Sequence, residues 1–129
     1  MIYIAAVGVL AILLLQATGS IPMSSVGGPM TIAAVILTVV VAVGIHEAWT
    51  MRRGVFGWII NLVVAFFGGL VGAQLGGFVA SMTLPYTGSL AATGGAVFAA
   101  ALVIGMLAAV AGAWGALQAV NRFRATPAR

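Results

Sequence analysis

The sequence lacks cysteine and lysine, and it contains a single acidic residue, Glu47, and a single histidine, His46. Without cysteine, the chain has no disulfides, no thiolate chemistry and no Cys-ligated metal or iron–sulfur cluster. Only 5% of the 129 residues are charged, whereas 64% are hydrophobic. This is too little charge to solvate the surface of a water-soluble domain of this size, so a lipid bilayer is the solvent that the composition fits.

Four apolar stretches are candidates for membrane-spanning helices, because about 20 residues are needed to cross a hydrocarbon core about 30 Å thick. Proline, glycine and polar residues separate them at 20–29 and 84–88, and an arginine pair separates them at 52–53. We predict an all-α membrane protein with one domain, residues 1–129, and four transmembrane helices at about 2–18, 30–50, 56–82 and 91–121. The first is the shortest. We expect it to be retained rather than cleaved as a signal peptide, since no basic residue precedes it and no A-x-A pattern follows it.

The arginines predict the orientation of these helices. All five lie in two places, next to the ends of apolar stretches: Arg52, Arg53, Arg122, Arg124 and Arg129. Arginine near span ends prefers the cytoplasmic side, and two crossings between the clusters place both on one face. We therefore predict that both termini are cytoplasmic. The same location argues against nucleic acid as a partner, although the net charge is +4.

Small residues recur every four positions in the predicted helix at 56–82, in two adjoining rows. The first row is Gly68, Gly72, Gly76 and Ala80, and the second is Ala65, Gly69, Ala73, Gly77 and Ser81. The last helix has a matching row of Ala101, Gly105, Ala109 and Ala113. Small residues let helix backbones approach closely in lipid, which predicts glycine-zipper packing. Two interpretations stay open: packing of these helices within one chain, and self-association into an oligomer.

His46 and Glu47 form a possible polar site at the membrane interface, one turn before the first arginine pair. Asn61 lies near the same edge of the membrane and is within reach of His46 in some arrangements. An Asp/Glu/His relay through the membrane would need such groups, but their depth favours interfacial anchoring. Two interpretations stay open: an interfacial anchor, and a site for a proton, an ion or a pigment.

The interior of the predicted spans has no ionisable side chain, and its main polar group at mid-depth is Gln74. This argues against a proton-coupled or ion-coupled transporter. No serine lies on the same face as His46, which argues against hydrolase chemistry. We expect no enzymatic activity, no cofactor and no metal.

Residues 39–124 contain an order of segments that is typical of a known family. A span, a short basic loop, a span reading IINLVVAFFGGLVGAQLGG, a polar turn and a last span with a basic tail follow one another. This order resembles the small bacterial transglycosylase-associated (GlsB/YeaQ/YmgE-type) membrane proteins, which implies a stress-associated protein of three spans without an established enzymatic activity. The sequence departs from that pattern by an additional first helix and by lacking the Pro-Gly that often follows the family's first span. No functional residues are carried over.

These observations predict a small protein of the bacterial inner membrane that acts through helix contacts. It would work as a homo-oligomer or as an accessory subunit of a membrane complex, with the lipid bilayer and other membrane subunits as its partners. The alternative is a channel or transporter-like oligomer for a small solute.

Overall fold

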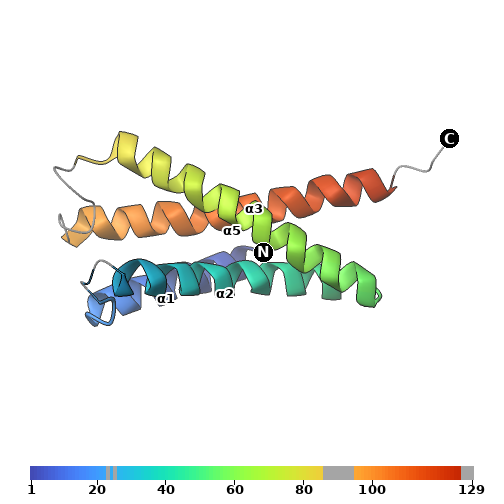
Figure 1. Ribbon diagram of the computed structural model, residues 1–129, viewed down its shortest axis with the longest axis horizontal. Coiled ribbons are helices and arrows are strands. Elements are labelled where there is room, and N and C mark those ends of the chain that lie inside the picture. The colour runs from blue at the N-terminus through green and yellow to red at the C-terminus, as the bar shows by residue number, and fades with distance from the viewer. Residues whose placement is uncertain (23, 25, 86–94, 126–129) are drawn as a thin grey trace.

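The computed structural model describes residues 1–22, 24, 26–85 and 95–125, and in this part of the chain all regular structure is helical. The helices are α1 (Ile2–Ala17), α2 (Gly27–Thr50), α3 (Val55–Thr83) and α5 (Gly95–Ala125). They run alternately up and down in a bundle elongated along the helix axes (Figure 1). The all-helical architecture predicted from the sequence is confirmed.

Three of these helices, α2, α3 and α5, are long and apolar enough to cross a membrane. They indicate a membrane protein. α1 is apolar too, but its 16 residues rise only about 24 Å, less than the roughly 30 Å of a hydrocarbon core. Figure 1 shows the beginning of α1 beside the middle of the bundle, and Tyr3 and Ile4 accordingly lie next to Thr38 and Ala42 of α2.

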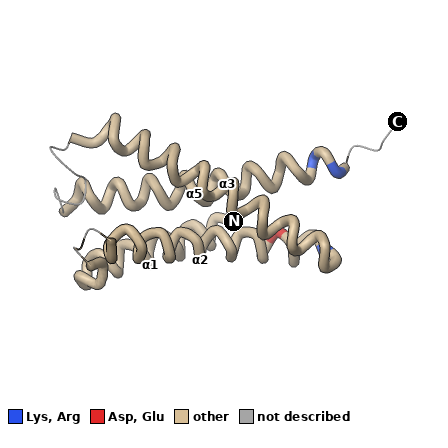
Figure 2. Tube along the Cα trace, in the orientation of Figure 1, with Lys and Arg blue, Asp and Glu red and all other residues tan. Residues whose placement is uncertain are grey.

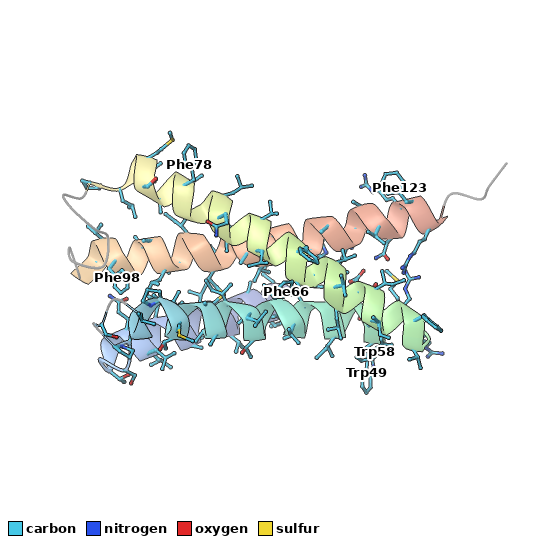
Figure 3. All side chains as sticks on the ribbon, viewed as in Figure 1. Trp49, Trp58, Phe66, Phe78, Phe98 and Phe123 are labelled. Atoms are coloured by element: carbon cyan, nitrogen blue, oxygen red, sulfur yellow. The ribbon has the colours of Figure 1, made fainter. Side chains whose placement is uncertain are left out.

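One end of the bundle collects the described arginines, and we call it the arginine end. There α2 and α5 terminate and α3 begins, so that Arg52, Arg53, Arg122 and Arg124 lie at the same end (Figure 2). Trp49, Trp58 and Phe123 also lie toward this end (Figure 3). The opposite end holds the end of α3 and the beginning of α5. The fifth arginine, Arg129, lies outside the described residues.

Two of the helix ends are closed by the same hydrogen-bond pattern. After α1, the N–H groups of Gly19 and Ser20 donate to the Gln16 and Leu15 carbonyls, and Gly19 has φ +66°. After α2, the N–H groups of Arg52 and Arg53 donate to the Trp49 and Ala48 carbonyls, with Arg52 at φ +47°. This is the Schellman motif, which satisfies the last carbonyls of a helix and requires one left-handed residue.

Two helix boundaries differ from those predicted. α2 begins at Gly27, before the expected Met30, so that Pro29 lies inside its first turn. Proline is tolerated there because the N–H that it lacks would have no partner within the helix. α5 continues to Ala125 rather than ending near Asn121, and its last turn contains Arg122 and Arg124, whose charge interacts favourably with the carbonyl end of a helix. The predicted beginning of this helix, 91–94, lies outside the described residues.

α2 and α5 each contact the three other helices, and α5 makes the more extensive contacts of the two. The inward strip of α5, formed by Leu102, Met106, Val110 and Leu117, is buried, and it meets Ile12 of α1 and Val40 and Val43 of α2 in one apolar core.

The most extensive contact in the bundle joins α3 to α5 at the first row of glycines. A methyl group placed on Gly68 would lie 2.6 Å from the Gly112 carbonyl oxygen, and one on Gly76 would lie 3.1 Å from the Gly105 Cα. A methyl on Gly72 would collide with the Ala108 carbonyl oxygen. The two backbones therefore touch along this row within a single chain.

Candidate functional site

Hydrogen bonds join three polar side chains near the arginine end: Glu47 of α2, Arg53 of the α2–α3 connection and Asn121 of α5. Together with Asn61, which is buried within the first two turns of α3 at the same end, we call them the polar cluster. Glu47 is only 5% exposed and Asn61 is fully buried. Because buried polar groups are costly unless they are paired, such a cluster needs a structural or functional explanation.

Asn121 links the two charged members of the cluster. Its Nδ2 donates a hydrogen bond of 2.8 Å to the Glu47 Oε1, and its Oδ1 accepts one of 2.6 Å from an Arg53 guanidinium nitrogen. The carboxamide has a donor and an acceptor, so it can satisfy an anion on one side and a cation on the other. Through this one residue, the end of α2, the α2–α3 connection and the last turns of α5 are held together.

Gly57 makes room for the arginine that completes this link. A methyl group at Gly57 would lie 2.8 Å from the Arg53 Cβ and 3.2 Å from its Cδ, so the aliphatic part of Arg53 lies flat on the first turn of α3. This brings the guanidinium from the connection to α5, with its Nε buried and without a hydrogen bond to the described residues. The absence of a side chain at Gly57 thus allows the Arg53 guanidinium to reach Asn121.

Asn61 lies at the same level of the bundle. Gly44, one turn before Glu47 on α2, packs against Ala65 and against the Asn61 carbonyl oxygen, at 3.1 and 3.4 Å from a methyl group placed on Gly44. Side chains of a helix lean toward its N-terminus, which for α3 is the arginine end, so the Asn61 carboxamide extends toward the level of Glu47. Neither its Oδ1 nor its Nδ2 has a hydrogen-bond partner among the described residues.

His46 lies apart from the cluster. It is exposed, and it lines a shallow surface pocket with Ile45, Trp49 and Thr50 on the outer side of α2. The hydrogen bond between His46 and Asn61 that the sequence allowed is not formed, since both polar atoms of Asn61 are unpaired. Neighbouring residues of a helix diverge by about 100°, so burial of Glu47 turns His46 outward.

Asn121 was not predicted as a site residue, although the sequence contains a signal for it. Ala109, Ala113 and Leu117 are buried at intervals of four on α5, and Asn121 continues this series by one more turn. The signal depends on helix continuing past residue 121, whereas the last helix was predicted to end at about Asn121. Arg53 was interpreted only as a topology marker, and its hydrogen bond to α5 was not foreseen.

The predicted helix-packing residues divide into three groups. Gly68, Gly72 and Gly76 face α5, as described above. Gly69 faces α2, where a methyl group would lie 2.5 Å from a Val40 methyl carbon. Gly77 and Gly105 have no heavy atom within 4 Å of such a methyl group. The second row is therefore covered by α2 near Gly69 and open at Gly77.

A groove between α2 and α3 lies where the second row becomes uncovered, and we call it the α2–α3 groove. Its volume is about 370 Å³. Gln74 is the polar side chain in its lining, which consists of Pro29, Ile32, Ala33, Ile36, Leu37 and Val40 from α2 and Phe66, Gly69, Leu70, Ala73 and Gln74 from α3. Phe66 marks the position of the groove along α3 in Figure 3.

The polar cluster can bind the helix ends together, and its chemistry is limited to a carboxylate, a guanidinium and two carboxamides. The described serines, Ser20, Ser24 and Ser81, lie toward the opposite end of the bundle and do not meet these groups. No group of three His, Asp or Glu side chains that would hold a metal ion occurs among the described residues.

Comparison with known proteins found no family model, no characterised protein and no solved structure that matches this chain. The arrangement of the polar cluster and of the α2–α3 groove therefore has to be interpreted from its own chemistry.

Proposed function

We propose that this chain is a non-enzymatic integral membrane protein that acts through contacts between helices, as a homo-oligomer or as an accessory subunit of a larger membrane complex. The observation that supports this proposal is the α2–α3 groove, which a single chain leaves open along helices that are apolar enough to lie in lipid. Its lining places glycine and alanine beside large apolar side chains. Such surfaces suit another helix, because small residues allow close approach and large ones supply dispersion contacts.

The proposal includes glycine-zipper packing, and it assigns the two rows of small residues to different contacts. Gly68, Gly72 and Gly76 are engaged with α5, where a side chain would meet backbone atoms. We assign this row to packing within the chain and leave contacts with other chains to the open part of the second row, around Gly77.

The polar cluster, in this proposal, anchors the arginine end rather than carrying out chemistry. Its hydrogen bonds join Asn121 to Glu47 and Arg53, which lie 74 and 68 residues earlier in the chain. Removing one partner of a buried charged hydrogen bond is strongly unfavourable, so the cluster resists separation of α2 from α5.

We further propose that the arginine end faces the cytoplasm of a bacterial inner membrane, because four described arginines share that end. The C-terminal end of α1 then lies at the opposite side of the membrane. The first residues of α1 approach the cytoplasmic face through local thinning of the bilayer, which is how a membrane accommodates a short helix.

Purification from native membranes in mild detergent, followed by mass measurement, tests the proposal. The chain alone has a mass of 13.0 kDa. We expect either a multiple of this mass or a stoichiometric complex with another membrane protein. A single chain without partners at every protein concentration would contradict the proposal, and solute flux through a self-contained oligomer in liposomes would favour a pore instead.

A further inference from the structure

Gln74 occupies an unusual position for a carboxamide, on the outer side of α3 and inside the membrane-spanning part of the helix. Residue 69 is the middle of Val55–Thr83, and Gln74 follows five residues later, about 7 Å along the axis. A hydrocarbon core about 30 Å thick extends about 15 Å on each side of its middle. With α3 centred in the bilayer, the exposed side chain of Gln74 lies within the hydrocarbon core, at a depth where water and headgroups do not reach.

The other uncharged polar side chains of the helices find partners within the chain or lie nearer the arginine end, where Asn61 is unpaired but buried inside the bundle. Gln16 donates to the Gly95 carbonyl oxygen at 3.0 Å, and the hydroxyls of Thr38 and Ser81 donate to carbonyls of their own helices. Gln118 lies one turn before Arg122, close to the arginine end. Gln74 makes no hydrogen bond with any residue that the structure describes. In hydrocarbon, such a carboxamide is costly unless a partner supplies a donor and an acceptor, and the described residues supply neither.

We propose that this partner is Gln74 of a second copy of the chain, so that two α3 helices cross at Gln74 and the second copy covers the α2–α3 groove. This inference rests on the proposed function and names its partner and surface. A carboxamide carries both a donor and an acceptor, so two of them related by a two-fold axis form reciprocal hydrogen bonds. An acyl chain of a lipid offers neither group.

The surroundings of Gln74 allow the approach that such a pair requires. Gly77, nearly one turn further along α3, has no heavy atom within 4 Å in the direction of a side chain. Leu70, about one turn before Gln74, is 46% exposed and lines the groove. A crossing at Gln74 therefore has a small residue on one side, where backbones can come close, and an apolar side chain on the other, where the second copy buries it.

Cross-linking tests the surface, since the chain has no cysteine of its own. In native membranes, Leu70→Cys and Gly77→Cys should each form covalent dimers under mild oxidation. Leu107→Cys provides the control, because Leu107 is similarly exposed but lies on α5. Covalent attachment of a different protein at both positions, or dimers formed by Leu107→Cys alone, would overturn the proposal.

Dimerisation of purified, fluorescently labelled chains in liposomes tests the role of the carboxamide. Gln74→Leu should weaken dimerisation roughly three- to twenty-fold, the range expected for hydrogen bonding between helices in membranes. Gln118→Leu removes the same group near the arginine end and should have little effect. Dimers that are unaffected by Gln74→Leu would refute the inference while leaving helix association intact. A stoichiometric complex with another protein, without dimers, would refute it too, whereas the absence of any partner in native membranes would also refute the proposed function.

Discussion

Asn121 is the residue whose position connects most of the arginine end, because it bonds to Glu47 and Arg53 at once. Each of these contacts joins α5 to a part of the chain more than sixty residues away. A carboxamide in this position serves an anion and a cation without carrying charge itself. Loss of Asn121 would therefore remove a hydrogen bond from both Glu47 and Arg53, whereas loss of either of these would leave Asn121 with one bond.

Asn121→Leu should destabilise the protein by about 1–3 kcal/mol or more, because it leaves a buried carboxylate oxygen and a guanidinium without a partner. Glu47→Gln should have a smaller effect, since the new amide oxygen still accepts the hydrogen bond from Asn121. Thermal unfolding in detergent, followed by circular dichroism, measures both. If Asn121→Leu unfolds at the temperature of the wild type, the cluster does not anchor the helix ends.

Gly72 lies directly against the backbone of α5, because a side chain there would collide with the Ala108 carbonyl. Gly72→Leu should destabilise the chain by at least about 1–3 kcal/mol, the usual cost of overpacking a tight contact. Gly115→Leu is the matched control, since Gly115 is exposed on α5 and has free space around it.

The readouts for Gly72→Leu are thermal stability and particle mass. A loss of stability with the mass preserved would assign the first glycine row to packing within the chain. A loss of mass with the monomer still folded would assign it to an interface between chains, contrary to the proposed division of the rows.

At the scale of the helices, α1 and α2 end in the same motif with different residues at the left-handed position, Gly19 and Arg52. Glycine adopts this conformation without steric cost, whereas other L-residues are strained by roughly 1–2 kcal/mol. Arginine at the end of α2 thus combines a structural disadvantage with a charge that favours the cytoplasmic side of a membrane.

Reciprocal substitutions test this interpretation of the helix ends. Gly19→Ala should destabilise the chain by about 1 kcal/mol through backbone strain alone, because no heavy atom lies within 4 Å of the added methyl group. Arg52→Gly should stabilise it by up to a similar amount, since the strain is removed. Thermal unfolding of both variants under identical conditions measures these changes in stability. Stabilisation by Gly19→Ala or destabilisation by Arg52→Gly would refute this interpretation of the helix ends.

At the scale of the whole molecule, the four described arginines lie at one end of an elongated bundle. Ser24 lies at the other end, where its hydroxyl accepts a hydrogen bond from Gly27 at the beginning of α2. With Ser24→Cys, a membrane-impermeant thiol reagent should label intact spheroplasts. With Ala125→Cys, at the end of α5, labelling should require permeabilised membranes, because positively charged ends stay in the cytoplasm. Labelling of position 125 from outside would invert the proposed orientation.

The sequence by itself determined the kind of molecule and the existence of its helices. Unbroken apolar runs between proline, glycine and arginine predicted all four, because backbone groups in lipid must be satisfied within a helix. Their boundaries were less certain. Whether Pro29 precedes a helix or lies in its first turn, and whether helix continues past Asn121, depends on the last turns and on their neighbours, which composition does not reveal.

Only the tertiary structure decided which face of each helix meets which neighbour. The helices are apolar on nearly every side, so hydrophobic periodicity gives little information about their rotation. Packing turned Glu47 inward and His46 outward, brought Asn121 to Glu47, and set Gly72 against Ala108 while leaving Gly77 open. The sequence shows small and polar residues at helical spacing. Their partners depend on how closely particular backbones fit together, which is a property of the assembled bundle.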